Sequence, residues 1–243
     1  MATVPTLFIS DLHLARERPA LIEAFHALTR GPAAGAAALY ALGDLFDAWV
    51  GDDQLKEPVA AGVAAAFAAL SASGTRVYLQ RGNRDFLLGE RFAEASGATL
   101  LADEVVHDLY GTRTLIMHGD QLCTDDVDYQ RFRAFWQDPA RRRRALAVPY
   151  FARRGVAGLM RAASRRATAA KPPPIMDVNA DAVAAALRKH GVARLIHGHT
   201  HRPARHEIVV DGRLCERYVL ADWYRNASYL RVDASGCEAV TIS

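Results

Sequence analysis

Side chains of the types that commonly bind metal ions follow five short apolar runs of this sequence. They form the groups Asp11-Leu-His13, Gly43-Asp44, Gly82-Asn83-Arg84-Asp85, His118-Gly-Asp120 and Gly198-His199-Thr-His201. Where strands end, such side chains point toward the loop face at which α/β folds build their sites. Each group alone is more typical of a solvated turn or a helix cap. All five in this order, each directly after a strand-like run, predict one shared metal centre.

Seven of these residues can donate an oxygen or a nitrogen to a metal ion: Asp11, His13, Asp44, Asn83, His118, His199 and His201. With one shared carboxylate, this set is enough for two ions. Mixed oxygen and nitrogen donors without a thiolate suit Mn²⁺, Fe, Co or Zn. Two ions about 3.5–4 Å apart bind a hydroxide and hold a phosphoryl group for in-line attack. The set therefore predicts a phosphoesterase with two divalent metal ions, and it leaves the identity of the metal open.

The elements that must position these residues are short strands and helices that are often rich in alanine. Strands are predicted at residues 6–10, 38–42, 76–80, 113–117, 194–197, 207–210, 217–220 and 228–232. Helices are predicted at residues 20–30, 58–71, 91–95 and 181–190. Asn179 is the predicted N-cap of the last helix, and Gly191 lies just beyond its end. The first half alternates strand and helix, whereas the tail has consecutive strands, as in hairpins.

Residues 127–171 differ from the rest of the chain. They carry no strand signal, and Pro139 and Pro149 divide them into two or three predicted helices. From Arg131 to Lys171 there are 12 basic residues and one acidic residue, a net charge of +11, whereas the remainder carries −8. We interpret residues 127–171 as a basic helical insertion, or cap, within a single domain of residues 1–243. Such a segment commonly meets an anionic partner.

Length and composition are typical of a globular protein. The 243 residues, 51% of them hydrophobic and 23% charged, suit one large domain. The N-terminus lacks the features of a signal peptide. The longest apolar run, residues 59–70, is shorter than the roughly 20 residues that a membrane span needs. Cys123, Cys215 and Cys237 show no C-x-x-C spacing, which favours a reducing, cytosolic compartment.

The order D-x-H, G-D-x-x-D, G-N-x-D, H and G-H-x-H resembles the calcineurin-like metallophosphoesterases, with Gly43-Asp44-Leu-Phe-Asp47 as the second piece. The resemblance spans almost the whole chain. It implies an α+β fold, a four-layer α/β/β/α sandwich of two β-sheets flanked by helices. It also implies that Asp44 bridges the two metals. One site would be completed by Asp11, His13 and His201, and the other by Asn83, His118 and His199.

Longer runs are similar to those of the UDP-2,3-diacylglucosamine hydrolases of lipid A synthesis. These runs are FISDLHL, ALGDLFDAWVGDD, GNRDFLLG, LIMHGDQLCTDD, PIMDVN and LIHGHTHRP. That family also carries a basic helical insertion at this place. The resemblance implies hydrolysis of a pyrophosphate bond by a metal-bound hydroxide that attacks the α-phosphorus, which releases UMP and 2,3-diacylglucosamine 1-phosphate (lipid X). It makes Mn²⁺ the expected metal and the cytoplasmic face of the inner membrane the expected location.

The same resemblance implies roles for individual residues. The catalytic residues would be Asp44, Asn83, Arg84, His118 and His199. Substrate contacts would come from Asn83, Arg84, Asp126, Ser164, Thr168, Lys171 and His199. The sequence departs from the family's pattern at two places. Pro172-Pro-Pro174 stands where the family is expected to have a less rigid stretch, and the run Arg141–Arg144 is more basic than is expected of the family.

Arg84 supports a pyrophosphate substrate by its chemistry. Many phosphoesterases of this superfamily have a histidine at this position, which can protonate an alkoxide leaving group. An arginine stays charged at neutral pH and cannot act as a general acid. The phosphate monoester that leaves from a pyrophosphate has a second pKa of about 6 and departs without a proton. Arg84 would then neutralise charge on the diphosphate; the alternative is a surface arginine paired with Asp85.

The predicted cap allows two interpretations. Its apolar residues, among them Leu146, Phe151 and Leu159, are interleaved with arginines. This pattern suits an amphipathic surface that meets acyl chains and anionic head groups. The alternative is a solvated basic cap that packs its apolar side on the body of the protein.

Two other functions compete with a lipid-directed hydrolase. One is another phosphoesterase of the superfamily that acts on nucleotides or nucleic acid, in which case the basic segment would grip a polyanion. The other is a scaffold that keeps the fold without catalysis. The aliphatic content of the cap favours lipid over bases, and all seven ligand positions hold residues that can bind a metal. We therefore expect a monomeric enzyme that binds an anionic membrane surface and no nucleic acid.

Overall fold

The computed structural model describes residues 3–170, 177–224 and 226–242, with side chains not described for residues 161–170. Six strands form the first sheet, in the order β11-β10-β1-β2-β3-β4. Their bounds are β1 Thr6–Ile9, β2 Ala38–Leu42, β3 Arg76–Gln80, β4 Thr99–Leu100, β10 Ser228–Asp233 and β11 Gly236–Thr241. Strands β1 to β4 are parallel, and the hairpin β10–β11 joins the β1 edge in the antiparallel sense.

The second sheet has five strands in the order β5-β6-β7-β9-β8. Their bounds are β5 Glu104–Leu109, β6 Thr112–Met117, β7 Arg194–His197, β8 Ala204–Val210 and β9 Arg213–Val219. The central strands β6, β7 and β9 are parallel, while β5 and β8 are antiparallel to their neighbours. Both sheets therefore have parallel centres, which place consecutive carboxyl ends at the same edge.

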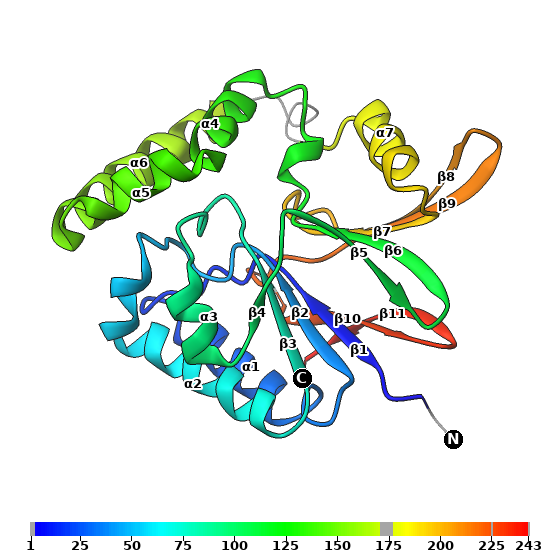
Figure 1. Ribbon diagram of the computed structural model, residues 1–243, viewed down its shortest axis with the longest axis horizontal. Coiled ribbons are helices and arrows are strands. Elements are labelled where there is room, and N and C mark those ends of the chain that lie inside the picture. The colour runs from blue at the N-terminus through cyan, green and yellow to red at the C-terminus, as the bar shows by residue number, and fades with distance from the viewer. Residues whose placement is uncertain (1–2, 171–176, 225, 243) are drawn as a thin grey trace.

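Three separate cores give the molecule four layers (Figure 1). The first core packs α1 (Pro19–Arg30), α2 (Pro58–Ala72) and α3 (Glu90–Ser96) on the outer face of the first sheet. The second lies between the two sheets, where Phe8 and Tyr40 stack 4.6 Å apart. The third packs α7 (Ala180–His190) on the outer face of the second sheet. The predicted four-layer α+β sandwich is confirmed.

Local sequence signals explain most of these elements. Proline occupies the first turn of α1 and α2, where its missing N–H has no helical partner to lose. At α7 the Asn179 side chain accepts from the amides of Asp181 and Ala182, and Gly191 ends the helix in a left-handed conformation. Strands β4, β5 and β11 were not predicted, because they lie at sheet edges and few of their residues are buried.

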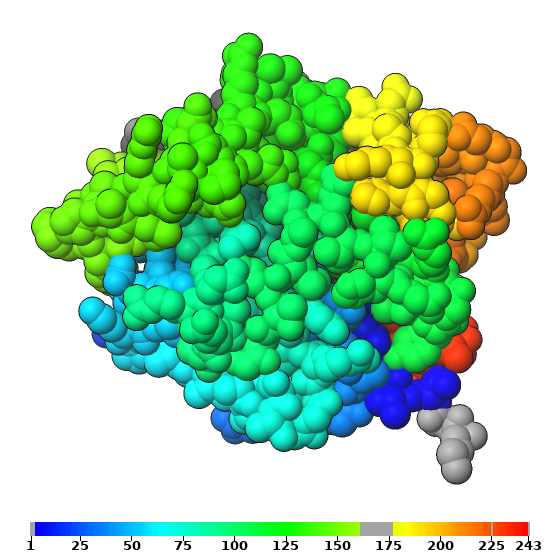
Figure 2. Space-filling model, viewed as in Figure 1, coloured from blue at the N-terminus to red at the C-terminus, as the bar shows by residue number. Residues whose placement is uncertain are grey.

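Three helices lie together over one end of the sandwich (Figure 1). They are α4 (Val127–Gln137), α5 (Pro139–Ala147) and α6 (Tyr150–Ala170), and together they are called the cap below. Asp126 and Asp138 cap the first two helices through their side chains, and Pro139 begins α5. Figure 2 shows the cap above the part of the body that holds the short helix η1 (Asp52–Lys56). Among the described residues, no helix is long and apolar enough to cross a membrane.

Candidate dinuclear metal centre

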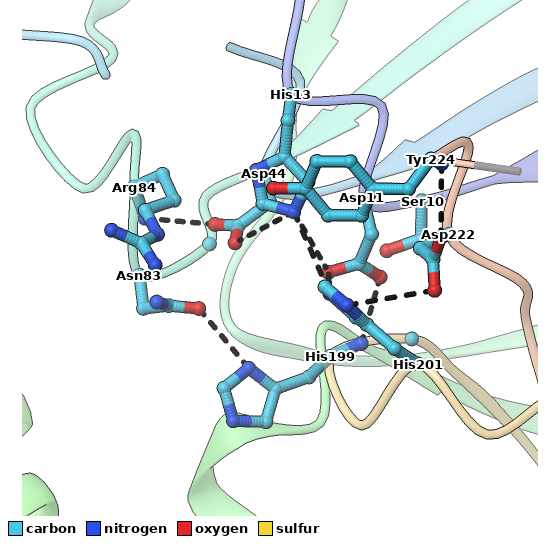
Figure 3. Close-up of polar contacts among 12 residues, drawn as sticks. Ser10, Asp11, His13, Asp44, Asn83, Arg84, His199, His201, Asp222 and Tyr224 are labelled. Carbon is cyan, nitrogen blue, oxygen red and sulfur yellow. Dashed lines mark hydrogen bonds and ion pairs between the residues drawn. The ribbon is translucent and has the colours of Figure 1, made fainter. Parts of the chain in front are cut away.

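The five ligand-type groups lie where the carboxyl ends of the strands meet. Strands β1, β2 and β3 run parallel in one sheet, and β6 and β7 run parallel in the other. Backbone and side-chain contacts join the two edges, because the His199 amide donates to Asp11 Oδ2 at 2.8 Å. The His118 ring, which follows β6, also lies 2.7 Å from the Leu42 carbonyl at the end of β2. The loops of both sheets therefore converge on one small volume (Figure 3).

The backbone of this centre is strained. Asp11, His13, Asp44, His199 and His201 all have positive φ, between 49° and 69°. Residues other than glycine rarely adopt this left-handed backbone conformation, and each residue that does so needs support from its surroundings. Among the remaining described residues, only two that are not glycine have a positive φ. The strain is therefore concentrated at the candidate site. Strain of this kind clusters at active sites and ligand-binding positions.

Two glycines let the β2 and β3 loops approach each other. A Cβ on Gly43, which has φ +84°, would lie 2.6 Å from the amide nitrogen of Gly82. A Cβ on Gly82 would in turn collide with the Asp44 carboxylate. The two positions thus require glycine for contact between the loops, and that contact places Asp44 beside Asn83.

Asp11, His13 and His201 form the first group of donors. His201 Nε2 lies 3.2 Å from Asp11 Oδ1, and the Nε2 atoms of His13 and His201 are 3.5 Å apart. His201 Nδ1 faces Asp222 Oδ2 at 3.5 Å, so the opposite ring nitrogen points into the centre. Nitrogen and oxygen atoms that face one another across so short a span suit a shared cation.

Asn83, His118 and His199 form the second group. The Asn83 Oδ1 atom lies 3.2 Å from His118 Nε2 and 3.0 Å from His199 Nδ1. His118 Nδ1 lies 2.7 Å from the Leu42 carbonyl, a contact that fixes the ring with Nε2 toward the centre. The amide oxygen and two imidazole nitrogens therefore converge as a metal ligand set would.

Asp44 stands between the two groups. Its Oδ2 lies 3.8 Å from His13 Nε2, and its Oδ1 lies 3.8 Å from His118 Nε2. The Arg84 amide donates to Oδ1 at 2.7 Å. A carboxylate with one oxygen toward each group is placed as a bridging ligand would be. The structure thus brings all seven predicted donors together, and their ligand roles stay a prediction.

Burial governs the protonation of the centre. It lowers the pKa of His13 to about 3 and that of His199 to about 4. Burial also raises the pKa of Asp44 to about 7, with added repulsion from two neighbouring carboxylates. For His118, burial disfavours the charged ring, but nearby carboxylates outweigh it and raise the pKa to about 9. Neighbouring carboxylates also raise the pKa of His201 against the effect of burial. Burial thus keeps His13 and His199 neutral at pH 7, while His118 and His201 are held toward the charged form by carboxylates that a divalent cation could pair with instead.

Asp85 supports the centre from beneath, a role that the sequence did not reveal. It is fully buried and accepts from the amides of Gly82 at 2.6 Å, Leu45 at 2.7 Å and Asp44 at 3.2 Å. It therefore ties the β2 and β3 loops together and takes its bonds from the backbone. The predicted alternative, in which Asp85 pairs with a surface Arg84, does not describe this arrangement.

Aromatic side chains flank the donors and were also not predicted. Tyr224 stacks on His13 with ring centroids 5.1 Å apart, and Tyr129 stacks on His199 at 5.7 Å. The Tyr129 hydroxyl donates a hydrogen bond to Asp120 Oδ2, which also accepts one from Arg133 Nε. A D-W-Y run after β9 and a tyrosine three residues after Asp126 were the available signals, but neither has a diagnostic spacing.

The remaining predicted substrate residues lie toward the cap. Asp126 caps α4 and accepts from the Tyr129 amide at 3.1 Å. Ser164 and Thr168 fall within α6, with their side chains outside the described set, and Lys171 lies outside the described residues altogether. Next to Asn83, a cavity of about 350 Å³ opens between the β3 loop and α4, lined by polar residues and by Phe86, Phe132 and Trp136. The candidate centre therefore borders open space beneath the cap at Asn83.

Comparison with known proteins agrees with this geometry. Residues 4–203 match the calcineurin-like phosphoesterases, and the chain belongs to that family. It is 51% identical to UDP-2,3-diacylglucosamine hydrolase of Escherichia coli O81 over 235 residues, which cover 97% of this chain and 98% of the relative. The proteins of the same name from Escherichia fergusonii and Shigella sonnei match with the same identity and coverage. The donor set, without a thiolate, fits the divalent metals that a phosphoesterase of this family uses.

Replacing Asp85 with alanine should destabilise the protein by about 3 kcal/mol or more, because three buried amides would lose their acceptor. Asp85→Asn keeps one oxygen and should lose less. Urea unfolding in the presence of a chelator measures the effect without a metal contribution. Asp108→Ala is the matched control, since Asp108 accepts one exposed turn amide from Gly111. Equal stability losses for Asp85→Ala and Asp108→Ala would contradict the supporting role of Asp85.

Proposed function

We propose that this protein hydrolyses the pyrophosphate bond of UDP-2,3-diacylglucosamine and releases UMP and 2,3-diacylglucosamine 1-phosphate. One observation carries the proposal. The six other predicted ligands converge around Asp44. The chain is also about half identical, over nearly its whole length, to hydrolases named for this substrate. A scaffold without catalysis would not need to keep this set intact. A reaction at a phosphorus atom is the chemistry that two such neighbouring sites support.

Two divalent ions, with Mn²⁺ as the proposed metal, would activate water and neutralise charge on the phosphoryl oxygens when bound. Asp11, His13 and His201 would hold one ion, and Asn83, His118 and His199 the other, with Asp44 shared. The chain's own contribution is to keep these donors oriented. Asp222 faces the outer nitrogen of His201, and the Leu42 carbonyl faces that of His118, so the inner nitrogens stay available.

Arg84 is proposed to bind the diphosphate. Its backbone donates to Asp44, so its side chain begins beside the bridging carboxylate (Figure 3). A guanidinium there can pair with two phosphate oxygens and stabilise the charge that develops as the bond breaks. Because arginine does not give up its proton at neutral pH, an arginine at this position suits a leaving group that departs unprotonated. The phosphate end of lipid X meets this condition.

The cap is proposed to receive the lipid part of the substrate and to rest on an anionic membrane surface. Phe151 and Leu159 on α6 are 78% and 75% exposed, and Leu146 and Val156 are also exposed. Arginines of α5 and α6 lie among these apolar residues. Apolar side chains at a bilayer surface gain from burial, and arginines gain from anionic head groups. Asp126, Ser164, Thr168 and Lys171 are proposed substrate contacts from this side.

The proposed location follows from the cap. A protein that acts on a lipid nucleotide and holds exposed apolar and basic side chains together is suited to the cytoplasmic face of the inner membrane, as a peripheral monomer. No nucleic-acid partner is proposed, because the exposed cap residues are largely aliphatic and bases are bound mainly by stacking on aromatic rings.

Mn²⁺ should stabilise the folded protein, since it binds the native donor set and not the unfolded chain. At about 100 times its Kd the expected gain is about 2.7 kcal/mol, measured as a rise in Tm after the protein has been treated with a chelator. Asp44→Ala should abolish this rise, whereas Asp128→Ala, which removes an exposed carboxylate of α4, should keep it. Equal Mn²⁺ stabilisation of Asp44→Ala and the wild type would contradict the shared ligand.

³¹P NMR with UDP-2,3-diacylglucosamine, detergent and Mn²⁺ should show UMP and the lipid monophosphate, with oxygen from ¹⁸O-water in UMP. Arg84→Met should lower kcat on the order of 100-fold to 1,000-fold, the usual cost of removing one charge-stabilising donor. Arg113→Met, on an exposed position of β6, should keep full activity. Heavy oxygen in the lipid phosphate would refute attack at the α-phosphorus. An intact lipid beside cleavage of a simple phosphodiester would refute the substrate.

Binding to vesicles that contain anionic lipid should weaken as salt is raised, because exposed charges are screened beyond about 10 Å at 0.1 M salt. The double variant Phe151→Ser with Leu159→Ser should lose most of the vesicle binding. Val209→Ser, which removes an equally exposed residue of β8, should not. Co-sedimentation measures all three proteins. Binding that is absent, or that is insensitive to salt, would exclude the membrane-surface role.

A further inference from the structure

Arg153 is the one buried residue among the cap residues whose side chains are described, 127–160. Its side chain is only 8% exposed, although it lies on α6 between the exposed residues Phe151 and Arg154. The guanidinium donates through Nη1 to the Val50 carbonyl and through Nη2 to Asp53 Oδ2. Its Nε donates at 2.8 Å to the carbonyl of Val148, at the end of α5. One side chain therefore joins α5, α6 and the body.

The body side of this contact is a short stretch, residues 49–53, called here the anchor segment. The Trp49 amide donates to the Arg84 carbonyl at 2.9 Å. Asp52 accepts from the amides of Gly89 at 3.0 Å and Phe92 at 3.2 Å. The segment also follows the loop that carries Asp44. The anchor segment therefore contacts the arginine proposed to bind diphosphate, and it is rigidly held by the start of α3.

Gly51 shows that the anchor segment is shaped around this arginine. Its φ is +128°, a conformation open to glycine and strained for other residues. A Cβ at this position would collide with the Arg153 guanidinium and crowd the Leu146 side chain. Because Gly51 has no side chain, there is space beside its backbone for the Arg153 guanidinium.

We propose that Arg153 is a positioning residue that fixes the cap at one spacing from the metal centre, and so sets affinity for substrates that contact both. The proposal rests on the proposed function, in which the diphosphate lies at the donors and the lipid part at the cap. At one end of the cap, Arg133 of α4 forms ion pairs with Asp103 and Asp120 of the body. Arg153 holds the opposite end, at the corner between α5 and α6, so that the cap spans the site from two supports.

The chemistry of the contact makes it specific to arginine. A planar guanidinium can serve three acceptors at fixed angles, whereas a lysine ammonium is a single point charge with a different reach. The Arg153 guanidinium is buried, whereas Asp53 is 36% exposed, so a shorter or uncharged side chain would leave the Val50 and Val148 carbonyls without their donor. The adjacent Arg154 provides the contrast, because it pairs with Glu57 while 65% exposed, and exposed pairs contribute little.

Steady-state kinetics on two substrates test the proposal. Arg153→Lys and Arg153→Met should raise KM for UDP-2,3-diacylglucosamine on the order of tenfold to a hundredfold, the effect expected of a small displacement of binding groups. Hydrolysis of bis(p-nitrophenyl) phosphate, which reaches the metal centre alone, should stay unchanged. Arg154→Gln should leave both reactions as in the wild type. An unchanged KM for the lipid, or an equal loss on both substrates, would overturn the positioning role.

A second measurement does not depend on the lipid reaction. Hydrogen exchange of the α6 amides at residues 150–160 should accelerate in Arg153→Met and in Asp53→Asn, with no further increase in the double variant, because both act on one contact. The strands should exchange as in the wild type. If the wild type fails to hydrolyse the lipid nucleotide, the proposed function falls, while faster α6 exchange alone would still show that Arg153 fixes the cap. If the α6 amides of Arg153→Met exchange as in the wild type, the proposal that Arg153 fixes the cap is refuted.

Discussion

The burial of carboxylates at one point governs the rest of this structure. Asp11, Asp44 and Asp85 are almost completely buried at the edge where the two sheets meet. Carboxylates removed from water need hydrogen bonds and positive charge close by. Asp85 obtains backbone amides, while the other two face imidazoles. The protein thus combines internal hydrogen bonds with a demand for cations, and that demand matches the divalent metals used by its family.

The sandwich supplies the rigidity that this arrangement needs. Five donors occupy left-handed backbone, and the β2 and β3 loops touch at two glycines. Such conformations persist only where the surroundings determine them fully. Parallel strands buried on both faces, with helices outside, hold each loop at its base. Since each sheet brings its own donors, the interface between the sheets also fixes the spacing of the two groups.

Sequence patterns could identify the donors because chemistry restricts their residue types and strand ends restrict their places. The interior strands could also be predicted, because continuous apolar runs such as residues 38–42 are typical of strands that are buried on both faces. The edge strands β4, β5 and β11 were missed because one open side weakens the pattern. The role of Asp85 was hidden because an aspartate in a turn can face water or backbone. Tyr224 and Asp222 reach the site only through the fold, from the far end of the chain.

The cap is held differently from the sandwich, and this difference separates chemistry from recognition. The sandwich is closed by three apolar cores. The cap meets the body through a few charged and polar contacts, made by Arg133, Tyr150 and Arg153, and through one small aromatic contact of Phe132 and Trp136 with Phe86. Apolar cores give cooperative stability, while a few polar contacts allow local opening at lower free energy. Donors that must not move therefore belong to the sandwich. The groups proposed to admit the lipid part belong to the cap, and Arg84, proposed to bind the diphosphate, follows β3 at the boundary between the two.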